Sequence, residues 1–196
     1  CHTACYDYDY NLAECTVPIS KITYVKENIP FLKKTGCVAI NMDSVSGWNL
    51  YGPHSYLADR LMWKADSDPD AILADYYEKC VGATAAPHLK AYWDRIDKAV
   101  VGSKTHSGSF YALTAIWTPD LVKACEADLD AAAVAAGTPD EKERVSLFRS
   151  GLGSARFWLQ FNDEMSRCDF VKARETFDRW CVHMNDANQK HYNSMD

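Results

Sequence analysis

The sequence of 196 residues lacks any apolar run long enough to cross a membrane, and it lacks clusters of Lys and Arg. A membrane span needs roughly 18 or more consecutive apolar residues. A nucleic-acid-binding surface needs a basic patch, whereas the formal net charge of this chain at pH 7 is −6. We therefore expect neither a membrane nor a nucleic acid as a partner.

Motifs for several common chemistries are also absent. The six histidines are scattered without His-x-His or His-x-x-x-His spacing, so no metal site is expected. No Gly-x-Ser-x-Gly elbow occurs, which argues against Ser-His-Asp hydrolysis. Residues 102–105 resemble part of a phosphate-binding loop, but the earlier glycine and the preceding strand are missing. The sequence predicts no metal and no cofactor.

The eight cysteines form no Cys-x-x-Cys pair. Several fall on the apolar faces of predicted helices, which favours buried free thiols over a disulfide framework. Cys1, Cys5 and Cys15 differ, because they lie close enough in sequence to form a bridge or to bind a metal in an oxidising compartment. The other five are Cys37, Cys80, Cys125, Cys168 and Cys181.

The first third of the chain predicts a β-α-β unit. Residues 3–10 alternate aromatic and acidic side chains with period two, which indicates a strand. Residues 22–32 carry an apolar helical face that ends at Gly36, although Pro30 should kink or split this helix. Residues 37–42 are an apolar run typical of a strand buried on both faces. The two strands should be parallel, with a right-handed crossover.

The rest of the chain predicts only helices. Helix starts are marked by Pro after Asp or Thr at residues 68–69, 118–119 and 138–139, and Glu141 completes a capping box at the last of these. At least five helices with short loops indicate a bundle. We therefore expect two domains, residues 1–66 and residues 67–196.

Two strands cannot close a sheet, and a (β/α)8 barrel needs roughly 250 residues. The predicted fold class is therefore α/β plus all-α: the C-terminal β-α-β portion of a TIM-type barrel, followed by a helical bundle domain. The chain begins with Cys and carries no leader, which suggests an excised piece of a longer protein or a mature product.

Several motifs carry a resemblance to a known family. They are a Tyr-Asp-Tyr strand end, a Lys-Lys-x-Gly turn, an apolar strand closing on Asp-Ser, the stretch W-x-x-YGPHSYLADRLMW and the stretch DPDAILADYYEKCVG. Over roughly residues 4 to 100 they resemble the bacterial glycosidase-like family called domain of unknown function 4838. The resemblance implies a TIM barrel followed by a helical region, a carbohydrate substrate, and a missing N-terminal barrel portion of the same protein. It also implies a secreted or periplasmic location.

Glycosidic cleavage needs two carboxyl groups, with aromatic platforms for the sugar ring. Because ligands of α/β folds bind at the carboxyl ends of parallel strands, we expect the site there. The candidate catalytic residues are Asp7, Asp9 and Asp43, and the candidate substrate-binding residues are Tyr8, Trp48, Tyr51 and His54. The alternative is that the acids are turn and cap residues, that the aromatic residues belong to the core, and that His54 caps a helix or is solvated.

The predicted function is that of a fragment of a carbohydrate-active, glycoside-hydrolase-like protein acting on a poly- or oligosaccharide. The alternative is a noncatalytic carbohydrate-binding module or a helical scaffold that mediates interactions. The two differ in whether two carboxyl groups converge in one pocket beside an exposed Trp.

Overall fold

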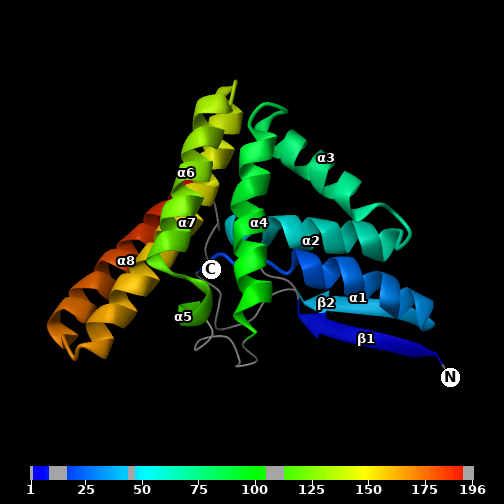
Figure 1. Cartoon of the computed structure of the whole chain (residues 1–196), viewed down its shortest axis with the longest axis horizontal. Helices are drawn as coiled ribbons and strands as arrows, with labels where there is room; N and C mark the ends of the chain where they lie inside the picture. The colour runs from blue at the N-terminus through cyan, green and yellow to red at the C-terminus, as the bar shows by residue number, and fades with distance from the viewer. Residues whose placement is uncertain (1, 9–16, 44–46, 105–112, 192–196) are drawn as a thin grey trace.

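The computed structural model describes residues 2–8, 17–43, 47–104 and 113–191. Within these ranges the chain forms eight helices and one two-stranded sheet (Figure 1). The elements are β1 (Thr3–Tyr8), α1 (Ile22–Lys34), β2 (Cys37–Asp43), α2 (Trp48–Trp63), α3 (Pro69–Val81), α4 (Ala86–Ser103), α5 (Leu113–Ile116), α6 (Pro119–Ala135), α7 (Pro139–Ser166) and α8 (Phe170–His191).

The sheet lies at one edge of the molecule, where β1, β2, α1 and α2 follow one another outside to inside (Figure 1). The strands are parallel, as predicted, and pair from Ala4 opposite Ala39 to Tyr8 opposite Asp43. The expectation of a strand buried on both faces is wrong, because the side chain of Val38 is 63% exposed. Helix α1 runs through Pro30 as one helix, so it is not split there, and a kink at Pro30 stays a prediction.

The predicted fold class is also wrong. The fold is mostly α-helical and is not a portion of a TIM barrel: the sheet has two strands within the described residues, and almost the whole core comes from helices. The physical reason is that a parallel strand needs a covering layer on each face, and α1 covers only one face of β2. The apolar side chains that form the core recur at helical spacing instead.

Helix α4 lies at the centre of the molecule, between α1–α3 on one side and α6–α8 on the other (Figure 1). Its Trp93 is fully buried and makes edge-to-face contacts with Tyr92 and with Phe148 of α7, at ring-centroid distances of 5.1 and 6.0 Å. The division into residues 1–66 and 67–196 stays a prediction. Buried side chains from both ranges contribute to the same core.

The buried segment before α1 is held by polar contacts. The backbone N–H of Ile19 donates to the Leu50 carbonyl at 3.1 Å, and the indole N–H of Trp117 donates to the Pro18 carbonyl at 3.0 Å. Buried Asp97 on α4 accepts from the Ser20 hydroxyl at 2.8 Å and from the Thr23 hydroxyl and backbone N–H. These bonds satisfy backbone groups that burial would otherwise leave unpaired.

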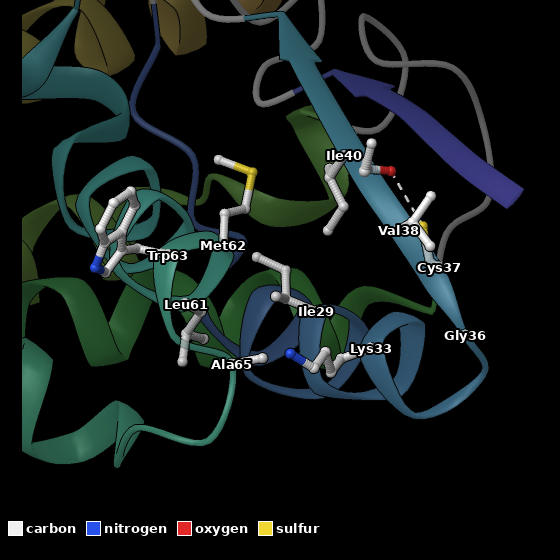
Figure 2. A pocket seen from close by; sticks show the side chains of 11 residues that line it. Ile29, Lys33, Gly36, Cys37, Val38, Ile40, Leu61, Met62, Trp63 and Ala65 are labelled. Atoms are coloured by element: carbon white, nitrogen blue, oxygen red, sulfur yellow. Dashed lines mark hydrogen bonds between the residues drawn. The ribbon is translucent and has the colours of Figure 1, made fainter. Parts of the chain in front are cut away.

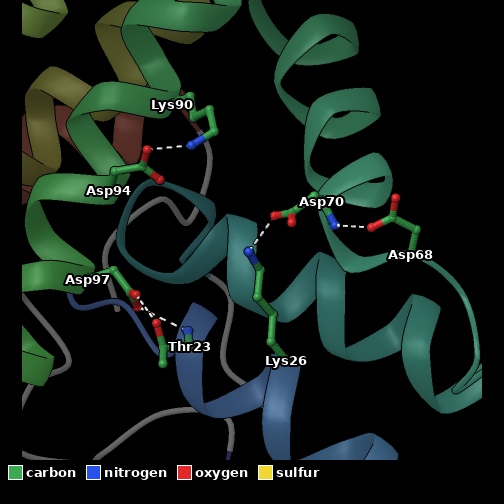
Figure 3. A network of polar contacts seen from close by, with 7 residues as sticks. All are labelled: Thr23, Lys26, Asp68, Asp70, Lys90, Asp94 and Asp97. Atoms are coloured by element: carbon green, nitrogen blue, oxygen red, sulfur yellow. Dashed lines mark hydrogen bonds and ion pairs between the residues drawn. The ribbon is translucent and has the colours of Figure 1, made fainter.

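Figure 3 shows how the polar contacts join α1 to its neighbours. Asp97 reaches Thr23 at the first turn of α1, and Lys26 in the next turn pairs with Asp70 of α3 at 2.6 Å. The Lys26 ion pair holds the pKa of the Asp70 carboxyl below its usual value, first through the hydrogen bond and then through the charge. Asp70 is exposed, so we expect this pair to contribute little to stability.

The predicted helix starts are confirmed. The Asp68 side chain accepts from the backbone N–H of Asp70 at 2.9 Å, and that of Thr118 accepts from Leu121 at 3.1 Å. Thr138 and Glu141 form the predicted capping box at the start of α7. Each cap satisfies a backbone donor that has no partner within its own helix. In the described ranges, no helix is both long enough and apolar enough to span a membrane.

Candidate functional site

Asp7 and Asp43 lie on opposite faces of the sheet. The Tyr24 hydroxyl of α1 donates to Asp7 Oδ2 at 3.1 Å, so Asp7 faces α1. Tyr6, the preceding residue on β1, donates its hydroxyl to Asp43 Oδ2 at 2.6 Å. Because successive side chains of a strand point to opposite faces, Tyr6 and Asp43 lie on the face away from α1. The structure therefore does not bring these two carboxylates together.

The environment of Asp7 is a chain of hydrogen bonds. The Asn28 side-chain amide donates to the Tyr24 hydroxyl at 2.8 Å, and Tyr24 in turn donates to Asp7. Partial burial raises the pKa of Tyr24, and the negative charge of Asp7 raises it further. Tyr24 thus remains a neutral donor, and this arrangement positions Asp7 against α1.

Tyr51 and His54 belong to the core. Both side chains are buried, and their rings meet edge to face with centroids 5.9 Å apart. His54 Nδ1 accepts the backbone N–H of Lys21 at 3.3 Å, which ties the start of α1 to α2. Asp9 and the side chain of Tyr8 lie outside the described residues.

Trp48 is a predicted site residue that lies at the edge of a cavity. Its side chain is 51% exposed, and it borders a cavity of about 380 Å³ between α2, α3 and α7. The lining residues are Trp48 and Tyr56 of α2, Tyr76, Lys79 and Cys80 of α3, and Arg144, Leu147 and Phe148 of α7. In α3 and α7 they occupy positions i, i+3 and i+4, and in α2 they are eight residues apart, so each helix presents one face to the cavity. We call this the Trp48 cavity.

A glycine makes room for the aromatic side chains of the Trp48 cavity. A Cβ atom at Gly52 would lie 2.5 Å from the Tyr76 hydroxyl and 3.0 Å from Trp48 Cε3. Only glycine at position 52 therefore leaves room for the Tyr76 hydroxyl and for the Trp48 indole against the backbone of α2. The ring of Tyr56, four residues further along α2, lies 5.2 Å from that of Tyr76 at an interplanar angle of 42°.

Polar groups border these aromatic walls. The Tyr56 hydroxyl donates to Asp75 Oδ2 at 3.2 Å, and Lys79 Nζ pairs with the same carboxylate at 2.8 Å. Arg144 Nη1 donates to the backbone carbonyls of Cys80 and Lys79, at 3.2 and 3.4 Å. These carbonyls belong to the last turn of α3, where helical partners are missing.

The Trp48 cavity offers binding groups rather than reactive ones. Burial raises the pKa of the Tyr76 phenol well above its usual value. Burial also raises the pKa of the Cys80 thiol to about 11, although the positive charge of Arg144 opposes this. Both groups are therefore neutral near pH 7, and the thiol is a poor nucleophile. No carboxylate is among the described residues that line the cavity.

Two other hollows of the described residues are less suited to a polar ligand. A groove of about 520 Å³ lies between β2 and the ends of α1 and α2, and Figure 2 shows its mostly apolar lining, with Lys33 as its cation. A hollow beside α7 contains Arg149 and Arg156, but these pair with Asp130 and Glu126 of α6. The described ranges contain no cluster of three or more potential metal-binding His, Cys, Asp or Glu side chains.

The described cysteines are free thiols. Cys125 is buried, whereas Cys168 is exposed, and Cys5, Cys37, Cys80 and Cys181 are partly buried. Cys1 and Cys15 lie outside the described residues, so a bridge or metal site within that group stays a prediction.

Comparison with known proteins bears on the first half of this arrangement. Residues 2–94 match the family model "Domain of unknown function (DUF4838)". This confirms the predicted resemblance to that domain of unknown function. The DUF4838 match contains β1 to α3 and ends within α4, so it includes Trp48, Tyr56 and Tyr76 but not Arg144. No match was found among curated proteins or among solved structures.

Sequence reasoning found Trp48 but missed Tyr56, Tyr76, Lys79 and Arg144. Tyr56 and Tyr76 occur on predicted apolar helix faces and read as core residues. A signal was present in Gly52, a glycine within a helical pattern and four residues from an aromatic on each side. The contribution of α7 could not be seen, because nothing in the sequence places residue 144 beside residue 80.

Proposed function

We propose that this protein binds an oligosaccharide in the Trp48 cavity without cleaving it. The observation that carries the proposal is the exposed indole of Trp48 beside a cavity that also contains the rings of Tyr56 and Tyr76. Aromatic rings offer flat apolar surfaces that can cover the C–H face of a sugar.

The polar border of the cavity supports a saccharide rather than a wholly apolar ligand. Tyr56, Lys79 and Arg144 supply hydroxyl, ammonium and guanidinium groups that can bond sugar hydroxyls. The volume of about 380 Å³ falls within the range of small-molecule sites. The glycosidase-like resemblance of the Trp48 and Tyr76 motifs also favours a carbohydrate.

Cleavage is not part of the proposal. Hydrolysis of a glycosidic bond uses two carboxyl groups about 5 to 9.5 Å apart across the scissile bond. Asp7 and Asp43 face opposite sides of the sheet, and neither lines the Trp48 cavity. A noncatalytic carbohydrate-binding role is therefore favoured over a hydrolytic one.

The test compares two exposed tryptophans of α2. The purified chain would be screened on an oligosaccharide array, and the binding members titrated by calorimetry against wild type, Trp48→Ala and Trp63→Ala. Trp48→Ala should weaken binding about tenfold or more, which corresponds to roughly 1.4 kcal/mol. Trp63→Ala should leave affinity unchanged, because Trp63 is 92% exposed and lies outside the cavity.

Two outcomes would contradict the proposal. Equal affinity of Trp48→Ala and wild type would place any binding elsewhere. New reducing ends appearing when the chain is incubated with its bound oligosaccharide would indicate hydrolysis.

A further inference from the structure

We infer that the Trp48 cavity selects an anionic saccharide, with Arg144 as the group that recognises the negative charge. This inference rests on the proposed function and adds the class of ligand. It follows from the charges that line the cavity and from the partners that each of them has.

Arg144 differs from most arginines of the chain in having no carboxylate partner among the described residues. Five others lie within ion-pair distance of an Asp or Glu side chain: Arg95, Arg149, Arg156, Arg167 and Arg174. The bonds of Arg144 run from Nη1 to two backbone carbonyls. A guanidinium has five N–H donors, so most donors of Arg144 remain available to a ligand.

The second cation of the cavity is already neutralised. Lys79 pairs with Asp75 at 2.8 Å, and the hydrogen bond from Lys79 holds the pKa of the Asp75 carboxyl below its usual value. Because Asp75 is thus ionised near pH 7, it offsets the charge of Lys79. The cavity wall therefore carries one uncompensated positive charge, on Arg144.

This local charge opposes the charge of the whole chain. With a formal net charge of −6, the protein as a whole repels anions. A cation without a carboxylate partner at the rim of an aromatic cavity provides local attraction for one negative group. The planar guanidinium fork matches a carboxylate or a sulfate and can bind either through two parallel hydrogen bonds.

A uronic acid combines the features that the cavity recognises. Its ring has an apolar C–H face for Trp48, and its carboxylate projects from the ring edge, where it can reach Arg144. A sulfated sugar shares this chemistry, and the ligands of the test separate the two sources. Charge-assisted bonds of this kind are roughly twice as strong as bonds between neutral groups.

The experiment uses ligands matched in shape but not in charge. Oligogalacturonate and oligoglucuronate would each be titrated beside their methyl esters, together with a sulfated galactan oligosaccharide and its desulfated form. Wild type should bind at least one anionic ligand about tenfold more tightly than its neutral partner at low salt, and added salt should reduce the difference.

Three variants assign the preference to Arg144. Arg144→Gln should abolish the preference for the anion, because it weakens binding of the anionic form far more than binding of the neutral form, and Arg144→Lys should restore part of the preference. Lys142→Gln is the matched control: it removes an exposed cation of α7 about 200° around the helix, and it should keep the preference. Thermal unfolding of each variant would establish that it is folded.

The outcomes separate this inference from the proposed function. Trp48-dependent binding with equal affinity for anionic and neutral ligands would overturn the inference alone, and so would a preference that survives Arg144→Gln. Absence of any Trp48-dependent saccharide binding would overturn both. A preference confined to the sulfated ligand would support an anionic saccharide and identify its source as a sulfate ester.

Discussion

Gly52 is the residue on which the shape of the Trp48 cavity most directly depends. Gly52→Ala would place a Cβ atom 2.5 Å from the Tyr76 hydroxyl, so the buried Tyr76 ring must move. Despite the better helix propensity of Ala, we expect a loss of about 1–3 kcal/mol in unfolding free energy from overpacking. We also expect weaker saccharide binding. Chemical denaturation and calorimetry would measure the two effects.

The control for this substitution is Gly102→Ala in α4. A Cβ atom at Gly102 would meet nothing within 4 Å, so alanine there should stabilise the helix by up to about 1 kcal/mol. If Gly52→Ala were as stabilising as Gly102→Ala, the close approach of Tyr76 would not matter to the fold.

At the scale of single residues, the sequence identified candidate site residues. It did not show which of their side chains face the core and which face the cavity. Trp48, Tyr51 and His54 were grouped because they follow one strand end. The structure starts α2 at Trp48. Around this helix Tyr51 and His54 lie about 60° and 120° to one side of Trp48 and face the core, whereas Tyr56 lies about 80° to the other side and faces the cavity. The Gly52-Pro53 pair is typical of a loop, so the sequence did not indicate that α2 already begins at Trp48.

Helices α7 and α8 form a hairpin whose open end contains a titratable group. His191 Nδ1 lies 3.1 Å from Glu143 Oε1 of α7. Burial lowers the pKa of His191, the charge of Glu143 opposes this, and that of Lys190 adds to it. The pKa of His191 in the folded protein lies below the unfolded value of about 6.5. His191 therefore stabilises the fold at pH values above about 6.5, and this stabilisation is lost as the pH falls through the folded pKa.

We therefore expect the unfolding free energy of wild type to decrease from pH 8 to pH 5 more than that of His191→Gln. Glu143→Gln should make the decrease larger, because removing the carboxylate lowers the pKa of His191 further. Denaturant titrations at several pH values would measure both. An identical pH dependence in wild type and His191→Gln would show that this end of the hairpin does not couple to protonation.

The starts of three helices were the best predicted feature. The starts of α3, α6 and α7 depend on local chemistry: a side-chain acceptor at the cap and a proline at the first helical position. The burial of residues 37–42 was not predictable in this way. An apolar run is enough to predict a strand. Whether that strand is buried depends on the layers that other parts of the chain place over its two faces.

The core of the whole molecule depends on contacts between residues inside the DUF4838 match and residues outside it. Pro53 has no N–H to donate to the Asn49 carbonyl, and α7 packs against that carbonyl so closely that a Cβ atom at Gly151 would lie 2.9 Å away. Trp93, near the end of the match, packs against Phe148 of α7. Helices outside the match thus complete the core of the helices inside it.

A fragment of residues 1–104 should therefore fail to unfold cooperatively, although it keeps α4 whole. Removing α6 and α7 would expose the buried face of α4, including Trp93, and a chain that exposes so much apolar surface is not stable. Circular dichroism melting would compare the fragment with the full chain. A cooperative transition at a similar temperature would instead identify the first 104 residues as an independent domain.

The sequence predicted the β-α-β unit and the helices after it, but not the class of the whole fold. That error came from extrapolating two parallel strands to a barrel. Periodicity locates elements, whereas the number of strands in a sheet depends on long-range pairing that local patterns do not encode.

The position of the sheet has a consequence for the order in which the chain opens. Strand β1 pairs with β2, and β2 packs against the core only through partly buried side chains such as Ile40 and Met42. Amide hydrogens of β1 should therefore exchange with solvent deuterium well before those of α4, whose side chains are buried at the centre. The two strands would detach as a cooperative unit of low local stability while the helices stay folded.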